Sequence, residues 1–373
     1  MSIIQKIITK PFFYGNIGFD KKEGDFMTKI VHIPQVEGFE KEIQQMAQAI
    51  LDDETVILPT ETVYGLGAHG LHSKAIKKIY EAKGRPQDNP LILHISHRSM
   101  LEQCIDGEVS EVVRKCMDAF WPGPLTLIFK KHAQVPQEIT AGLPTVAVRM
   151  PNHPIALRII EEANVPVAAP SANRSGKPSP TQSQHVIDDM NGRVDYIVTS
   201  NDSEVGLEST VLDLSGKTPI ILRPGGVTKE QLEDLLGMEV WQSDLILDTQ
   251  TPRAPGMKYT HYAPEAPMFL VMGSVEHMIN YINKQVLIHH SQNKKVAVIG
   301  YDEYQSLIHG DFVVSLGSLQ NQVEVAHNVF DALRQCDQKQ VDIIYAIGLD
   351  DKQLGSAIMN RLRKAAGHQS IEV

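Results

Sequence analysis

Apolar and polar residues alternate along this chain in two rhythms, one typical of helices and one typical of short buried strands. Glu40–Leu51 repeats its apolar residues at three- and four-residue intervals, which predicts an amphipathic helix. Thr55–Leu58 is a short apolar run stopped by Pro59, which predicts a strand. The same patterns predict further helices over Ser73–Ala82, Val109–Phe120, Pro154–Ala163, Pro180–Met190 and Lys229–Leu236, and further strands over Leu91–Ile95, Leu125–Phe129, Thr145–Arg149, Val165–Ala169, Tyr196–Thr199, Ser209–Leu214 and Ile220–Leu222. Their irregular spacing favours an α/β fold with a mixed sheet.

After Glu265 the pattern changes and predicts a second, smaller α/β unit. Met268–Met272, Val296–Ile299 and Ile343–Ile347 are uninterrupted apolar runs of the kind found in buried parallel strands. Leu354–Lys364 has the periodicity of a helix. Parallel strands separated by helices predict a Rossmann-like C-terminal domain.

These changes of pattern divide the chain into four predicted segments. Residues 1–26 contain no apolar core of a signal peptide, and we interpret them either as a mobile tail or as an upstream translation product. In the second case Met27 would be the true start. Residues 27–250 form the predicted first domain, 251–264 a linker, and 265–373 the C-terminal domain. The linker carries aromatic and basic side chains between its prolines, whereas a plain spacer would be rich in Ser, Gly and Glu. We therefore expect the linker to contact a functional site.

Composition narrows the class of protein. The chain has 373 residues, of which 42% are hydrophobic and 21% are charged, as in globular proteins of two or three domains. No apolar stretch approaches the roughly 20 residues of a membrane span, so we expect no membrane anchor. The net charge of -10 argues against a surface that coats nucleic acid. Cys104, Cys116 and Cys336 lack C-x-x-C spacing, which predicts reduced thiols in a cytoplasmic protein without a zinc site.

Two short matches to nucleotide-binding motifs do not support that function by themselves. Gly65–Gly70 spells G-x-G-x-x-G, but a dinucleotide fingerprint follows its strand directly, and here Thr60–Tyr64 intervenes. We interpret these glycines as residues of tight turns. Ser215–Thr218 resembles the end of a phosphate-binding loop, but the first glycine would have to be at Val211, inside a predicted strand. We expect a hairpin turn there.

Two polar clusters far apart in the sequence have the chemistry of a phosphate site. The run Lys83–Leu91 places Lys83 and Arg85 one residue apart at a predicted helix end, and Pro170–Asn173 carries Ser-x-Asn in a proline-rich loop. Cations this close repel each other unless an anion holds them, and a polyphosphate would do so. Taken alone, the pair is equally well explained as a solvated pair at a helix C-terminus, where the dipole also favours cations.

The surrounding motifs favour the phosphate site. Pro59–Gly67 is a hydroxyl-rich loop that leaves a predicted strand and suits a small polar ligand. The other motifs are Trp121–Thr126, Val146–Pro151, Pro170–Pro180, Val205–Val211, Leu222–Gly225 and Ala254–Pro264. Together with the two clusters, this series closely resembles the YrdC-type threonylcarbamoyl-AMP synthases, and the linker and C-terminal domain resemble their two-domain branch. The resemblance extends from about Ile30 to the C-terminus.

This resemblance implies both a reaction and a fold. L-threonine, bicarbonate and ATP, the last with Mg²⁺, would become L-threonylcarbamoyl-AMP and diphosphate, and a tRNA threonylcarbamoyl-transferase complex would use the product. The first domain would be a twisted mixed sheet with helices around a basic cavity. Because carbamates are short-lived in water, we expect an enclosed site. Positioning and charge neutralisation would supply most of the rate.

The resemblance also assigns roles to particular residues. Lys83 and Arg85 would be the catalytic residues and would hold phosphates, Arg85 through a bidentate fork. Arg149 would pair with the carboxylate of threonine. The L-threonine site would comprise Thr62, His94, Arg149 and Ser209, and the ATP site Lys83, Arg85, Asn89, Thr145, Ser171, Asn173, Ser179, Arg223 and Tyr262. The linker up to Tyr262 would close over the nucleotide as a lid held by the C-terminal domain, and no protein metal ligand is implied.

Two other functions stay open from the sequence. A basic cavity could bind double-stranded RNA without catalysis, or make a weak RNA contact beside the enzymatic function, although the acidic balance argues against it. The chain could also be a related carbamoyl-transfer module for metallocentre assembly, but it lacks the zinc-finger cysteines expected there.

Overall fold

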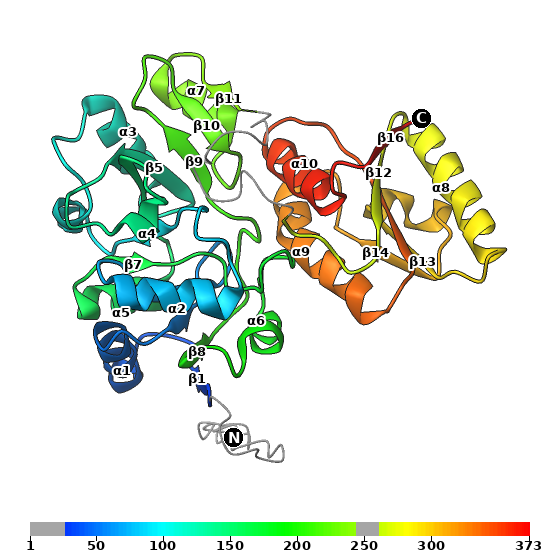
Figure 1. Cartoon of the computed structure of the whole chain (residues 1–373). Coiled ribbons are helices and arrows are strands. Elements are labelled where there is room, and N and C mark those ends of the chain that lie inside the picture. The colour runs from blue at the N-terminus through cyan, green and yellow to red at the C-terminus, as the bar shows by residue number, and fades with distance from the viewer. Residues whose placement is uncertain (1–26, 244–260) are drawn as a thin grey trace, which may run out of the picture.

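The computed structural model describes residues 27–243 and 261–373, which form two α/β domains, each built on its own sheet (Figure 1). The predicted tail and the part of the predicted linker before His261 lie outside the described residues. Among the residues described, no helix combines the length and apolar character that crossing a membrane requires.

The larger domain contains an 11-stranded sheet in the order β1-β8-β2-β3-β7-β4-β6-β5-β9-β10-β11. Parallel and antiparallel neighbours are interspersed: β4 runs parallel to β6, for example, and β6 antiparallel to β5. The predicted mixed sheet is therefore confirmed. Its strands are β1 (Lys29–His32), β2 (Val56–Leu58), β3 (Gly65–His69), β4 (Ile92–His94), β5 (Leu125–Lys130), β6 (Thr145–Arg149), β7 (Val167–Ala168), β8 (Tyr196–Thr199), β9 (Thr210–Asp213), β10 (Ile220–Arg223) and β11 (Trp241–Gln242).

Local chemistry sets the ends of the helices in this domain. The helices are α1 (Glu40–Leu51), α2 (Ser73–Lys83), η1 (Arg98–Gln103), α3 (Glu111–Phe120), α4 (Gln137–Thr140), α5 (Pro154–Ala163), α6 (Ser183–Met190) and α7 (Lys229–Leu236). Helix α2 ends after Lys83 because Gly84 takes the left-handed conformation at φ 62. Helix α3 begins at Glu111, two residues after the predicted start, because the Ser110 side chain caps it by accepting a hydrogen bond from the Val113 amide. Helix α6 likewise begins later than predicted, at Ser183.

The prediction of tight-turn glycines over Gly65–Gly70 is wrong for Gly65 and Gly67, whereas Gly70 does lie in the turn that follows the strand. Gly65 and Gly67 lie in β3, whose neighbours β2 and β7 both run antiparallel to it. A Cβ on Gly67 would lie 2.8 Å from the Val56 carbonyl oxygen, and one on Gly70 would lie 2.6 Å from the Pro166 carbonyl oxygen. Close backbone packing therefore accounts for Gly67 inside the strand, and it also restricts Gly70 at the turn. The Ser215–Thr218 hairpin is confirmed, because it joins the antiparallel strands β9 and β10.

The C-terminal domain is Rossmann-like, as predicted. Its sheet has the order β14-β13-β15-β12-β16, and every neighbouring pair is parallel. Its elements are β12 (Met268–Met272), α8 (Val275–His290), β13 (Val296–Gly300), η2 (Asp302–Leu307), β14 (Phe312–Ser315), α9 (Gln322–Gln338), β15 (Ile343–Ile347), α10 (Leu354–Ala365) and β16 (Ser370–Glu372). The buried apolar runs of the sequence are the central strands β12, β13 and β15.

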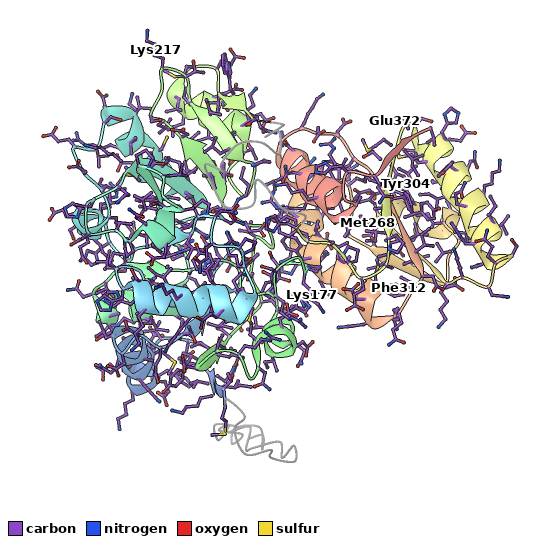
Figure 2. The ribbon with its side chains drawn as sticks, viewed as in Figure 1. Lys177, Lys217, Met268, Tyr304, Phe312 and Glu372 are labelled. Carbon is purple, nitrogen blue, oxygen red and sulfur yellow. The ribbon has the colours of Figure 1, made fainter. Side chains whose placement is uncertain are left out.

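The two domains pack against each other and share apolar contacts. Val63 and Leu207 from the first domain, and Tyr262 from the linker, belong to the apolar core of the C-terminal domain. Polar contacts surround this junction: Lys177, labelled in Figure 2, lies on the side that faces the C-terminal domain and pairs with Glu265 at 3.4 Å. Helices α9 and α10 are the elements of the C-terminal domain that face the larger one (Figure 1).

Candidate active site

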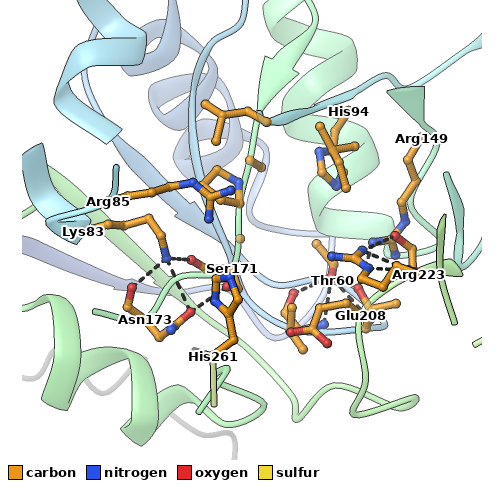
Figure 3. A pocket seen from close by; sticks show the side chains of 18 of the residues that line it. Thr60, Lys83, Arg85, His94, Arg149, Ser171, Asn173, Glu208, Arg223 and His261 are labelled. Atoms are coloured by element: carbon orange, nitrogen blue, oxygen red, sulfur yellow. Dashed lines mark hydrogen bonds between the residues drawn. The ribbon is translucent and has the colours of Figure 1, made fainter. Parts of the chain in front are cut away.

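A cavity in the larger domain collects most of the predicted site residues, and Figure 3 shows its lining. Its walls come from loops and strand ends that are far apart in the sequence but meet at one side of the sheet. The lining includes Thr60, Thr62, Lys83, Arg85, His94, Arg149, Ser171, Asn173, Glu208, Ser209, Arg223, His261 and Tyr262.

Lys83 links the two clusters that the sequence separates. It is the last residue of α2, and its ammonium donates to the carbonyl oxygen of Ser171, to that of Asn173 at 2.7 Å and to the Asn173 side-chain oxygen at 3.4 Å. Ser171 Oγ donates to the same side-chain oxygen at 2.6 Å, so lysine and serine fix the Asn173 amide together (Figure 3). The Ser-x-Asn loop is therefore held in place by the cation of the other motif.

Arg85 lies beside Lys83 and is also enclosed. Its Nη2 donates to the carbonyl oxygen of Pro90 at 3.0 Å, which anchors the guanidinium to its own loop. Burial lowers the pKa of Arg85 to about 10, and burial together with Arg85 holds the pKa of Lys83 well below its usual range. Among the described residues, no salt bridge joins either cation to a carboxylate. Two desolvated, mutually repelling cations are the electrostatic signature of a polyanion site.

A second group of residues forms at the adjoining ends of β4 and β6. Arg149 pairs with Glu61 at 2.7 Å and donates to Thr62 Oγ1 at 2.9 Å and to the Gly123 carbonyl oxygen at 3.1 Å. His94 lies opposite Arg149 in the parallel register. Burial and the nearby Arg149 lower the pKa of His94 to about 3, so its imidazole stays neutral at physiological pH. A guanidinium, a hydroxyl and a neutral imidazole suit a small amino acid.

Sequence reasoning gave Glu61 no role, yet it is as buried as Arg149, with 4% of each side chain exposed. A salt bridge this deep requires close geometry to offset desolvation. The signal in the sequence was the position of Glu61 between two threonines of a hydroxyl-rich loop that leaves a strand.

A third group surrounds Ser209, immediately before β9. Arg223, at the end of β10, donates to the Ser209 carbonyl oxygen at 2.9 Å and to Ser209 Oγ at 3.1 Å. The Thr126 and Ser209 hydroxyls lie 2.7 Å apart. Next to them, Glu208 accepts a hydrogen bond from Ser179 Oγ at 2.6 Å. Burial alone would raise the pKa of Glu208, but nearby arginines lower it to about 2 and keep the carboxylate charged.

Three predicted site residues do not line the cavity. Ser179 is fully buried and binds Glu208, so it contacts the lining from behind. Thr145 lies at the start of β6, opposite Lys130. Asn89 is buried, and neither polar atom of its side chain has a hydrogen-bond partner among the described residues. Asn89 is therefore the one of the three whose side chain still needs a ligand.

The described end of the linker closes one side of the cavity. Burial and the neighbouring Arg85 lower the pKa of His261 to about 3. The Tyr262 ring packs against Phe330 of α9 with 5.0 Å between centroids, and burial raises the pKa of Tyr262 to about 12. The linker thus enters the site while resting on the C-terminal domain. Most of the predicted lid precedes these residues and lies outside the described part of the chain.

Comparisons with known proteins show which family this chain resembles. A family model named Sua5_yciO_yrdC and described as telomere recombination matches residues 48–225, and one described as threonylcarbamoyl-AMP synthase, C-terminal domain, matches residues 227–367. A threonylcarbamoyl-AMP synthase of Bacillus subtilis is 46% identical over 88% of this chain and 94% of its own length. The corresponding protein of Schizosaccharomyces pombe is 36% identical over 84% of this chain and 85% of its own. The crystal structure of P. abyssi Sua5 complexed with L-threonine is 44% identical, covers 93% of this chain and all of that chain, and superposes with a TM-score of 0.87.

Proposed function

We infer that this chain, which belongs to the two-domain Sua5 family of threonylcarbamoyl-AMP synthases, is itself such a synthase. It is a nucleotidyltransferase, which joins the AMP moiety of ATP to a carbamate of L-threonine. The amine of L-threonine and bicarbonate combine to a carbamate with loss of water. A carbamate oxygen then attacks the α-phosphorus of ATP, and diphosphate leaves. The resemblance found in the sequence is thereby confirmed at the level of the family.

The observation that carries the proposal is the division of one cavity into two chemically different parts. On one side lie the buried Lys83 and the partly exposed Arg85, neither of which has a salt bridge to a carboxylate among the described residues. On the other side lie Thr62, His94 and Arg149, whose combination suits a small amino acid. A reaction that joins ATP to an amino-acid carbamate needs such neighbouring sites.

We propose the following division of roles within the cavity. Lys83 and Arg85 hold the phosphates and offset charge that develops as diphosphate leaves. Arg149 orients the carboxylate of threonine. Thr62, His94 and Ser209 complete the threonine site, and Asn89, Thr145, Ser171, Asn173, Ser179, Arg223 and Tyr262 surround ATP. Asn89, Thr145 and Ser179 do not line the cavity, so the role of Thr145 and Ser179 would be indirect, and Asn89 would act through its unpaired amide.

Mg²⁺ would enter with ATP and offset charge on its phosphates. Among residues 27–243 and 261–373, no group of three or more His, Cys, Asp or Glu side chains could hold a metal ion. Magnesium keeps several waters and commonly uses substrate phosphates as ligands, so the residues present fit a metal carried by the nucleotide. Removal of Mg²⁺ is expected to stop the reaction without changing the fold.

The threonylcarbamoyl-adenylate must be consumed by a second enzyme, and we propose a tRNA threonylcarbamoyl-transferase complex as that partner. The three cysteines are free and buried, in keeping with a cytoplasmic location. Any weak contact of the cavity with RNA would be an addition to the synthase activity and not an alternative to it.

Diphosphate release by the purified protein tests the proposal. ATP and Mg²⁺ are supplied with L-threonine and bicarbonate, and each of the last two is omitted in turn. Release that requires both, with threonylcarbamoyl-AMP identified by its mass, is expected. Release that needs neither would contradict the proposed reaction. A salt-sensitive affinity for double-stranded RNA with no release under any condition would instead favour the RNA-binding function.

A further inference from the structure

The segment that carries Ser209 lies between the cavity and the C-terminal domain. Gly206, at φ 73, approaches α9 so closely that a Cβ there would lie 2.3 Å from His327 Cα. Leu207 is fully buried in the core of the C-terminal domain. Glu208 and Ser209 follow and line the cavity. One short stretch of backbone therefore has the C-terminal domain on one side and the substrate site on the other.

Arg361 of α10 reaches this segment from the C-terminal domain. Its side chain is completely buried, and its Nε donates to Glu208 Oε2 at 2.8 Å. Its Nη1 donates to the Pro224 carbonyl oxygen at 2.9 Å and to Asn360 Oδ1 at 2.9 Å. Two adjoining cavity segments, Glu208–Ser209 and Arg223–Pro224, thus share one guanidinium. The planar fork of arginine can serve both, whereas the single ammonium of lysine cannot hold this geometry.

We propose that Arg361 is a positioning residue of the active site, supplied by the C-terminal domain, that fixes Ser209 and Arg223 at the cavity wall. The kinetic test of this inference rests on the proposed function, whereas the test by hydrogen–deuterium exchange does not. Arg361 touches no reacting atom in this assignment; it acts through Glu208 and Pro224. The C-terminal domain then contributes to the chemistry of the first domain and does more than hold the linker.

Competition for Glu208 gives the physical reason. Arg223 lies close enough to Glu208 for their charges to interact, and it lies still closer to Ser209. Ser179 Oγ also donates to Glu208, but a hydroxyl does not neutralise its charge. Because a buried carboxylate without a cation partner is costly, Glu208 would draw Arg223 away from Ser209 if Arg361 were absent. Arg361 satisfies Glu208, so that Arg223 remains on Ser209 and faces the substrate. The Tyr262 ring also lies 5.7 Å from the Arg361 guanidinium, which brings the end of the linker into the same arrangement.

A second buried arginine between the domains provides a matched control. Arg334 of α9 pairs with Asp189 of α6 at 2.7 Å and donates to the Pro178 carbonyl oxygen at 2.6 Å. Like Arg361, it is an almost fully buried arginine that joins a carboxylate and a carbonyl of the larger domain. Neither Asp189 nor Pro178 lines the cavity. If buried arginines serve only to dock the domains, Arg361→Met and Arg334→Met should have similar effects.

The experiment compares Arg361→Met, Arg361→Lys and Arg334→Met in the full-length protein. Arg361→Met is expected to lower kcat about 100-fold, the scale of a misplacement near one ångström, with a smaller change in the KM for ATP. Arg361→Lys should recover part of this loss, because it restores the charge at Glu208 but not the second contact. Arg334→Met should change kcat less than about threefold, because its partners Asp189 and Pro178 lie outside the cavity and share no contact with the site residues tested here.

Hydrogen–deuterium exchange of the backbone gives a readout that does not depend on activity. Peptides covering residues 205–210 and 222–226 should exchange faster in Arg361→Met and should not change in Arg334→Met. If Arg361→Met is unstable, the double variant Glu208→Gln/Arg361→Met removes the lone buried carboxylate, and the same exchange pattern is expected from it. Equal kinetic and exchange effects of the two arginine variants, or none in Arg361→Met, would overturn the proposal. If the wild type made no threonylcarbamoyl-AMP, only the proposed function would fail, because the exchange comparison would still decide the role of Arg361.

Discussion

Replacing Lys83 with methionine should separate catalysis from stability more sharply than any other single change. The variant keeps the length of the side chain but loses an ammonium that donates to the Ser171 carbonyl and to two oxygens of Asn173. Hydrogen bonds of charged groups are worth about 1.5–3 kcal/mol each. The same ammonium is buried beside Arg85, which opposes its charged form and offsets much of this gain. We therefore expect a change in unfolding free energy within about 1 kcal/mol, near the typical single-mutation value.

Activity should respond very differently. A donor aimed at charge that develops in the transition state is worth about 2.7–4 kcal/mol, so diphosphate release should fall roughly 100- to 1,000-fold. Inorganic diphosphate should raise the melting temperature of the wild type and not that of Lys83→Met, because the anion no longer meets this cation. Lys78→Met provides the control, since Lys78 lies on the same helix but faces Asp195 at 3.9 Å, away from the cavity.

The pH dependence of stability gives the sign of the Lys83 contribution. Its pKa is lower in the folded chain than in the unfolded chain, so between the two values the unfolded state binds more protons. Burying the charged lysine therefore costs stability at low pH, and this cost disappears as the pH rises from the folded pKa toward about 10.5, the unfolded value for lysine. As the pH rises through that range, the unfolding free energy of the wild type should therefore increase relative to that of Lys83→Met. Diphosphate release at the wild-type rate in Lys83→Met would show that Lys83 takes no part in the reaction. A fall in unfolding free energy of more than about 3 kcal/mol would show that Lys83 serves mainly to stabilise the fold. Either result would refute the reasoning.

Three further changes test other parts of the site. Gly225→Ala should displace the cavity segment that carries Ser209, because the new Cβ would lie 2.3 Å from the Glu208 carbonyl oxygen. We expect the unfolding free energy measured in urea to fall by about 1–3 kcal/mol. Gly216→Ala is the control and should cause no measurable change, because the nearest atom there is 3.8 Å away. His94→Gln should reduce the loss of unfolding free energy as the pH falls from about 6.5 to about 3. In this range the unfolded His94 binds a proton, whereas the folded residue, with a pKa of about 3, does not. Parallel curves of unfolding free energy against pH for the wild type and the variant would contradict this. Chelation of Mg²⁺ should abolish diphosphate release and leave the melting temperature of the ligand-free protein unchanged, and a fall in that temperature would reveal a structural metal site.

Elements governed by local pattern could be predicted from the sequence, whereas the order of strands could not. The buried run Ile343–Ile347 is a central strand, and Lys83 ends a helix where Gly84 allows the left-handed turn. The position of β8 between β1 and β2 depends on contacts between residues far apart in the chain, which periodicity does not encode. Gly65 and Gly67 were misinterpreted for the same reason, since the backbones that crowd them belong to other strands.

The cations Lys83, Arg85 and Arg149 could be predicted, but the buried carboxylates of the site could not. Lys83 and Arg85 stand one residue apart in a proline-rich run, a pattern uncommon enough to suggest chemistry. Glu61 and Glu208 are single acidic residues in loops, and a single acidic residue in a loop is usually solvated. Arg361 lies on a helix more than a hundred positions after Glu208, so only the packing of the two domains shows that they pair.

The pairing of charges indicates where each substrate should bind. Arg149 and Arg361 are each neutralised by a buried glutamate, while Lys83, Arg85 and Arg223 have no salt bridge to a carboxylate among the described residues. Unpaired buried cations are costly, and a bound polyanion would remove that cost. The triphosphate of ATP should therefore lie along Lys83 and Arg85, with Arg223, which donates to Ser209, at the boundary with the threonine site. Arg149 is already occupied by Glu61, Thr62 and Gly123, so it can share its guanidinium with a single carboxylate but is poorly placed to hold several phosphates. From the distribution of glutamates we therefore propose that the polyanion and the amino acid bind on opposite sides of one cavity.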